Sequence, residues 1–115
     1  MQDLLISVHL YALADKYNIS IIREPIIQSI QSKLLNYEGD EDGDLHLKAV
    51  VKAHYEKATS VGGPLGTLVA THIVINCSRF MEGNECMQLI MTYSTFGADM
   101  ALAALLNAEF VVCWG

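Results

Sequence analysis

The chain has 115 residues, 52% of them hydrophobic, and its thirteen acidic and seven basic side chains give a formal net charge of −6. This length suits one domain with a single core, and the apolar content exceeds what such a domain usually hides, so part of it is expected to contact a partner. The basic residues are scattered singly, which argues against nucleic acid as a ligand.

The first residues of the chain and its cysteines indicate the cellular compartment in which the protein is expected. Residues 1–3 lack the basic region of a secretory signal, so the protein is expected inside the cell, in the cytoplasm or nucleus. Cys77, Cys86 and Cys113 have no short regular spacing, which is typical of buried free thiols in a reducing environment. The longest uncharged run, residues 58–78, contains glycines, a proline and an asparagine and makes a poor bilayer span.

Residues 3–17 predict a first helix that is apolar on two faces. Only a narrow strip through Asp3, Ser7 and Ala14 is polar or small. A helix of this kind is expected to be surrounded by other elements.

The end of the first helix is predicted at Tyr17. Asn18 tolerates the left-handed backbone that closes a helix, and Ile19 can then fold back onto it. Ser20 is predicted to cap a second helix over residues 21–35.

The second helix has one apolar stripe and one irregularity. The irregularity is Pro25, which lies past the first turn and removes a backbone hydrogen bond, so the helix is expected to start late or to bend there. The stripe consists of Ile22, Ile26, Ile30 and Leu34.

Residues 36–44 hold five acidic side chains and two glycines and predict an exposed loop. Asp44 is placed to cap a third helix over residues 45–58. The spacing of acids from Glu38 onward is similar to that of a calcium-binding loop, but Ala49 stands at the twelfth position, where such a loop has its bidentate Glu. A solvated acidic loop without metal is therefore the interpretation.

The rest of the chain predicts further helices. After a break, a fourth helix is predicted over residues 65–81. Its segment 71–75 is β-branched enough to form a strand, but the length of the apolar pattern favours a helix. Two more helices are predicted over residues 84–93, capped by Asn84, and 96–108, before an apolar tail at 109–115. The fold class is thus an all-α small bundle of about five helices.

Candidate chemical groups are interpreted as structural. His54 and His72 lie on the apolar stripes of their helices, which is typical of core residues rather than ligands. The segment 62–67 lacks the lysine and the spacing of a phosphate-binding loop and predicts an interhelical turn. No serine or cysteine stands in a nucleophile signature, so neither an enzyme nor a cofactor is expected. The methionines at 81, 87, 91 and 100 are interpreted as core filling.

One segment resembles a known family. The run His9-Leu10-Tyr11-Ala12-Leu13-Ala14-Asp15-Lys16-Tyr17-Asn18-Ile19 is similar to the helix-turn signature of BTB/POZ domains, especially the fungal group. The segment Phe96–Leu102 resembles, more weakly, a closing helix of fungal members. Pro25 departs from the family pattern, which has an apolar helix former there.

The resemblance implies an organisation. Residues 1–35 would be a BTB/POZ C-terminal helix pair, 36–44 an acidic loop, and 45–108 a C-terminal helical extension. The strands and helices that open such a domain are absent from the sequence, so the chain looks like its C-terminal half, without most of the usual homodimer surface.

The resemblance also implies a function. BTB/POZ domains are interaction modules, and many are adaptors that hold substrates on cullin-type ubiquitin ligases. In a whole domain the missing half would cover the second apolar face of the first helix. An uncovered interaction face is therefore expected among Leu5, Ile6, Val8, Leu10 and Leu13, which a second copy, another protein or the chain's own C-terminal helices would cover.

Two alternatives come from the apolar content. The chain could be a free-standing helical bundle that binds an apolar ligand, or a membrane-associated fragment. The apolar tail at 109–115 fits both of these readings.

Overall fold

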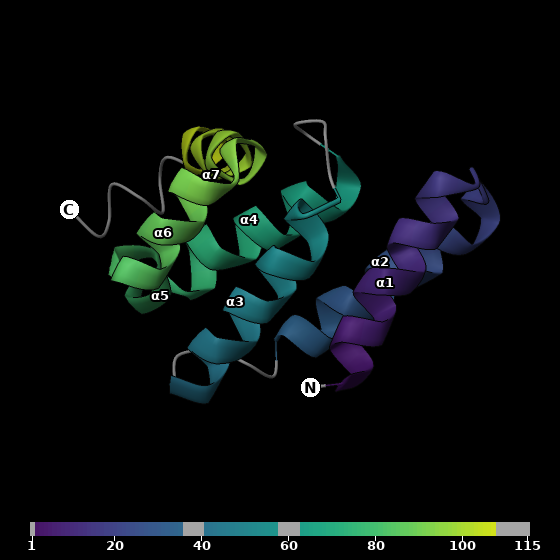
Figure 1. Cartoon of the computed structure of the whole chain (residues 1–115), viewed down its shortest axis with the longest axis horizontal. Coiled ribbons are helices and arrows are strands. Elements are labelled where there is room, and N and C mark those ends of the chain that lie inside the picture. The colour runs from purple at the N-terminus through teal and green to yellow at the C-terminus, as the bar shows by residue number, and fades with distance from the viewer. Residues whose placement is uncertain (1, 36–40, 58–62, 108–115) are drawn as a thin grey trace.

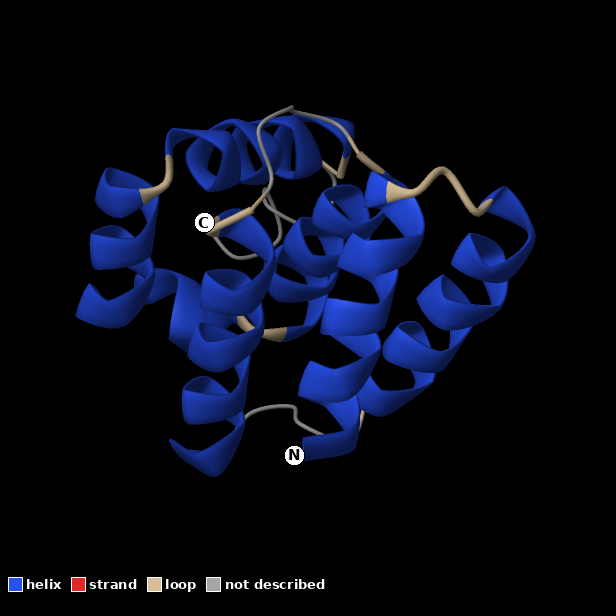
Figure 2. Cartoon of the chain, turned by 45° about the vertical axis from the view of Figure 1, so that its right-hand side comes forward, coloured by secondary structure: helices blue, strands red, loops and turns tan. Residues whose placement is uncertain are grey.

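The computed structural model of the chain describes residues 2–35, 41–57 and 63–107. Within these ranges every regular element is an α-helix (Figure 2), which confirms the predicted all-α fold class. The described ranges hold seven helices, more than the predicted number of about five. They are α1 (Gln2–Lys16), α2 (Ser20–Leu34), α3 (Glu41–Tyr55), α4 (Pro64–Asn76), α5 (Ser78–Glu82), α6 (Asn84–Thr92) and α7 (Ser94–Leu106).

The helices build a body of 42 × 26 × 25 Å, with α1 and α2 at one end of its long axis and α5, α6 and α7 at the other (Figure 1). Arg23 of α2 forms a 3.2 Å ion pair with Asp15 near the end of α1. Lys33 near the end of α2 donates a 2.9 Å hydrogen bond to Ser7. These contacts show that α1 and α2 run antiparallel. One hydrophobic cluster then takes residues from all seven helices.

The turn between α1 and α2 has the predicted left-handed residue. Asn18 has a φ of 55°, the N–H of Ile19 donates to the carbonyl of Ala14 at 2.8 Å, and the N–H of Asn18 donates to that of Asp15 at 3.2 Å. This pair of bonds ends α1. Ser20 is not the cap that was expected. The turn needs only Asn18 and Ile19 beyond Tyr17, so Ser20 is already the first residue of α2. No side chain caps this helix.

Helix α2 runs through Pro25 without starting late. Its apolar stripe is buried only toward the C-terminal end, where Ile30 and Leu34 have no more than 1% of their surface exposed. Ile22, before the proline, is 41% exposed. The first turns of α2 therefore project past the core.

Helix α3 begins at Glu41, earlier than the predicted start at residue 45. Asp44, the predicted cap, thus lies inside the helix, and the predicted loop is wrong for residues 41–44. Acidic residue types are favoured in the first turn of a helix because the helix dipole is positive there. An acidic composition alone therefore does not distinguish a loop from a first helical turn. Residues 36–40 and the predicted end at Ala58 lie outside the described ranges.

The predicted helix over residues 65–81 is two helices, α4 and α5. They are separated at Cys77, whose φ of −128° and ψ of 52° lie outside the helical region. The turn lets both Cys77 and Phe80 reach the core, at 3% and 2% exposed. The segment 71–75 lies within α4, so the strand alternative is wrong.

The starts of the remaining helices also differ from the predictions. Asn84 is the first residue of α6 and Gly83 occupies the N-cap, so Asn84 does not cap it. Helix α4 begins at Pro64, which is well placed there because the first turn does not need its N–H. The turn predicted over residues 62–67 is therefore wrong for residues 64–67. Helix α7 begins at Ser94.

Three other helices meet at the first turn of α4. Tyr11 of α1 is hydrogen-bonded to the backbone of Leu65. The hydroxyl of Tyr55 on α3 lies 3.4 Å from the carbonyl oxygen of Gly66 and donates a 2.6 Å hydrogen bond to Asp99 of α7. We call these five residues the α4 junction.

Burial and charge explain why the junction holds. Asp99 is only 3% exposed, and its carboxylate lies at the N-terminal end of α4, where the helix dipole favours negative charge. Burial, together with the hydrogen bond to Asp99, raises the pKa of Tyr55, which therefore stays a donor. Gly66 is required because a Cβ there would meet the Asp99 carboxylate and come within 2.9 Å of the Tyr55 hydroxyl oxygen.

Among the described residues, no single helix is both long and apolar enough to cross a membrane. Helices α6 and α7 reach the required length and composition only together, and they are bent by 119° at their break.

Gly66→Ala tests the close approach at the junction. We expect the free energy of unfolding to fall by about 1 to 3 kcal/mol because Asp99 and Tyr55 must move, although alanine is the better helix former. Urea denaturation followed by circular dichroism measures the loss. The control is Gly63→Ala, which meets nothing within 4 Å. Equal stability of the two variants would contradict the close contact.

Candidate functional site

The outer face of α1 carries a row of exposed apolar side chains. They lie at i, i+4, i+7 and i+11, which places them on one side of the helix. The last of them follows directly after the end of α1, where its N–H still donates to the carbonyl of Leu13 at 3.0 Å. We call this row the α1 seam; it consists of Ile6, Leu10, Leu13 and Tyr17, which are 54%, 47%, 52% and 64% exposed.

The opposite face of α1 is the one that enters the core. Leu4, Val8 and Tyr11 are at most 5% exposed. Ser7 and Ala14, which belong to the narrow strip of polar or small residues, are buried as well, at 7% and 1%. These small residues allow α2 to approach closely, and Ser7 receives a hydrogen bond from Lys33 on α2.

The residues of the expected interaction face are divided between two sides of α1. Ile6, Leu10 and Leu13 belong to the exposed α1 seam. Val8 is 1% exposed and Leu5 packs partly against the core, so neither belongs to it. Tyr17 completes the row, and its spacing of four from Leu13 was the signal that could have added it.

The BTB/POZ-like segment supplies residues to the core, the turn and the surface. Tyr11 and Ala14 face inward, and Ala12 is partly buried. Asp15 pairs with Arg23, and the Lys16 ammonium lies 5.4 Å from the centre of the Tyr17 ring. The segment therefore orients α1 and at the same time contributes three of the four seam residues, Leu10, Leu13 and Tyr17.

The exposed apolar surface continues around the tip of the α1–α2 pair. Ile19, Ile21 and Ile22 are 42%, 83% and 41% exposed. Seven of the fourteen large hydrophobic residues that are exposed in the described ranges thus fall between residues 6 and 22. A surface of this kind marks an interaction site more often than a scattered set of apolar residues does.

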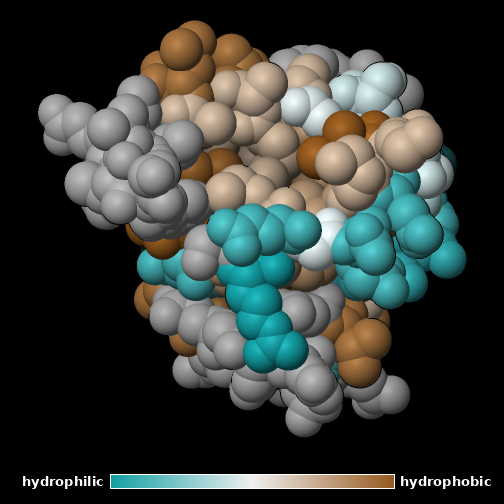
Figure 3. Space-filling model, turned by 90° about the vertical axis from the view of Figure 1, so that its left-hand side faces the viewer, coloured by the Kyte–Doolittle hydropathy of each residue, from teal (hydrophilic) through white to brown (hydrophobic). Residues whose placement is uncertain are grey.

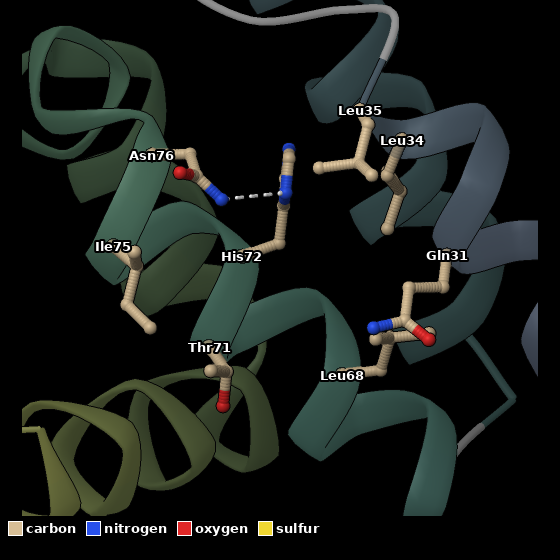
Figure 4. Close-up of a pocket in the computed structure, with 8 residues that line it drawn as sticks. All are labelled: Gln31, Leu34, Leu35, Leu68, Thr71, His72, Ile75 and Asn76. Carbon is tan, nitrogen blue, oxygen red and sulfur yellow. Dashed lines mark hydrogen bonds between the residues drawn. The ribbon is translucent and has the colours of Figure 1, made fainter.

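A small pocket lies between α2 and α4 (Figure 4). Its volume is about 170 Å³, below the roughly 300 to 1,000 Å³ of typical ligand sites. On its α4 side the side-chain amide of Asn76 lies 3.3 Å from Nδ1 of His72. The residues that line it are Gln31, Leu34, Leu35, Leu68, Thr71, His72, Ile75 and Asn76. Its size does not favour the apolar-ligand alternative.

The candidate chemical residues take structural positions. His72 is 6% exposed within α4, and His54 stacks edge-on against Tyr55 with ring centres 4.6 Å apart. Burial lowers the pKa of His54, which the charges of Asp99 and Asp15 only partly oppose. Burial raises the pKa of the free Cys86 thiol to about 11, so it stays protonated near neutral pH.

The described cysteines are buried, and no metal-binding cluster occurs among the described residues. Cys77 is buried like Cys86, as expected, while Cys113 lies outside the described ranges. No group of three or more His, Cys, Asp or Glu residues that could hold a metal ion occurs in the described part of the chain.

The methionines are only partly core residues, which corrects their interpretation as core filling. Met100 is buried, but Met87 and Met91 of α6 are 58% and 80% exposed. Leu105 and Leu106 of α7 are also exposed. Figure 3 shows hydrophobic surface on the upper part of this end of the molecule, where α6 and α7 lie, above a hydrophilic band. From α7 the chain continues directly into residues 108–115, outside the described ranges.

The sequence interpretation missed the contact between Tyr55 and Asp99. The available signal was an acidic residue on the apolar side of a helix, at i+3 from Phe96 and next to Met100, which are both buried. An acid at such a position needs a donor from a neighbouring helix. The arrangement ties α3, α4 and α7 together.

Compared with models of known protein families, with curated protein sequences and with solved structures, the chain has no match.

Tyr55→Phe removes one hydrogen-bond donor from the buried Asp99 carboxylate. We expect the free energy of unfolding to fall by about 1 to 3 kcal/mol, because losing a hydrogen bond to a buried charged acceptor is costly. Tyr17→Phe is the matched control, since that hydroxyl lies on a side chain that is 64% exposed. If both variants melt alike, the hydrogen bond contributes nothing to stability.

The lowered pKa of His54 predicts a dependence of stability on pH. In the unfolded chain the imidazole binds a proton near its ordinary pKa of about 6.5, whereas in the fold it resists protonation. The contribution to stability is therefore complete above about pH 6.5 and is lost as the pH falls through the lower, folded pKa. Urea unfolding between pH 7.5 and 5 should show a smaller loss for His54→Gln than for the natural chain. His9→Gln, at an exposed histidine, should keep the original slope.

Proposed function

We propose that the chain is a non-catalytic protein–protein interaction module that binds its partner through the α1 seam. The observation that carries the proposal is that four large apolar side chains on one face of α1 are about half exposed or more. Covering one half-exposed leucine or isoleucine contributes about 0.7 to 1.5 kcal/mol, so the row offers substantial binding free energy to a complementary surface.

The rigidity of α1 supports this role. On its buried face the Tyr11 hydroxyl is hydrogen-bonded with the backbone of Leu65, and at the surface the ion pair between Asp15 and Arg23 joins α1 to α2. A partner therefore meets a preformed surface and does not have to order a flexible segment, which lowers the entropic cost of binding.

The resemblance of residues 9–19 to BTB/POZ domains adds a class to the proposal. By that resemblance alone, the module would act inside the cell as an adaptor, with a cullin-type ubiquitin ligase scaffold as one partner, or as an oligomerisation element. A purified cullin-type scaffold is therefore the first defined protein to try against the α1 seam.

Leu10→Asp tests the proposal, because it puts a charge at the centre of the α1 seam without entering the core. In affinity capture from the source cell, we expect a discrete set of other proteins to bind the natural chain and to be recovered at least about tenfold less with Leu10→Asp. Circular dichroism should show that the variant keeps its helices.

Met91→Asp is the matched control for this capture, since Met91 is 80% exposed on α6, at the other end of the molecule. It should keep the full set of bound proteins. Recovery of the same set with Leu10→Asp as with the natural chain would refute binding through α1.

A further inference from the structure

The α1 seam has the spacing of one side of a two-helix interface. Its residues are separated by four, three and four positions, the spacing by which a helix presents alternate apolar residues to one partner helix. All four are exposed, so the position of that partner helix is open. A helix is therefore the element that fits this face.

The spacing is also a palindrome, because four, three and four read the same in both directions along α1. A two-fold axis that crosses the helix between Leu10 and Leu13 brings Leu10 of one copy beside Leu13 of the other. The same axis brings Ile6 beside Tyr17 at each end. Interfaces between two identical chains require this self-complementarity, whereas a different partner does not.

The charges along α1 permit the same pairing. In this register Lys16 of one copy comes level with Ser7 of the other, and His9 level with Ala14, so neither meets a like charge at its own level. Asp15 lies away from this side, in its ion pair with Arg23. Although the whole chain carries −6, residues 2–35 hold three acidic and three basic side chains, so the two copies do not repel strongly at this end.

We infer that the α1 seam pairs antiparallel with the α1 seam of a second copy of this chain. The inference rests on the proposed function and names the partner. The exposed parts of the four side chains amount to roughly 400 Å² per chain and about 800 Å² for the pair, the size of a weak, transient contact. The dimer is therefore weak, and we expect it to form between about 10 µM and 1 mM.

Sedimentation equilibrium of the purified chain from about 10 µM to 1 mM tests the pairing. The average mass should rise with concentration from 12.7 kDa toward twice that value. Leu10→Asp and, as a second variant, Leu13→Lys should raise the dissociation constant at least tenfold, while Met91→Asp should leave it unchanged. A mass of 12.7 kDa at all concentrations, or a dimer that survives Leu10→Asp and Leu13→Lys, overturns the inference.

Disulfide trapping tests the orientation, in a chain that also carries Cys113→Ser. When Ile6→Cys and Tyr17→Cys chains are mixed and oxidised, antiparallel pairing predicts a bond between positions 6 and 17, identified by peptide mass mapping. Ile6→Cys alone should form little dimer, because its two copies would lie at opposite ends of the interface. Efficient bonding of position 6 to itself would show parallel helices and overturn the antiparallel pairing.

The two proposals can fail separately. If the purified chain stays monomeric while the cellular proteins captured with it depend on Leu10, the second copy is wrong and the interaction module stands. If neither self-association nor capture responds to Leu10→Asp, both proposals are wrong.

Discussion

The first turn of α4 is the constraint on which the rest of the arrangement depends. It receives Tyr11 from α1 at the backbone of Leu65 and Tyr55 from α3, and it lies against Asp99 from α7. A buried carboxylate is tolerated there because the phenol donates to it and the helix dipole favours its charge. Helices from both ends of the molecule thereby contact one short segment of backbone. Its glycine, Gly66, lets the polar groups come close.

This constraint also decides what the molecule presents to solvent. Since Tyr11 points to α4, helical geometry turns the residues of the α1 seam to the opposite side, where no described helix covers them. The contacts of Arg23 with Asp15 and of Lys33 with Ser7 prevent α1 from rolling about its axis. The exposure of the α1 seam is therefore a consequence of how the core is closed.

Helices with strong periodic patterns were predictable from the sequence, and their first residues were less so. The end of α1 followed from Asn18, because few residues other than glycine accept its positive φ. The start at Glu41 was placed too late and Asn84 was predicted to be a cap, because polar residues suit a loop, a cap and a first helical turn alike. The break at Cys77 has no marker such as proline, and only the packing of Phe80 reveals it.

The sequence by itself determined that this chain is helical, that α1 is apolar on two sides, and that the histidines at 54 and 72 belong to apolar stripes, since each follows from local periodicity. Only the tertiary structure decided which side of α1 is buried. The two faces have similar apolar content, so burying either would release similar free energy. The choice came from Tyr11 and Ser7, whose hydrogen bonds to α4 and α2 exist only when those helices are in place.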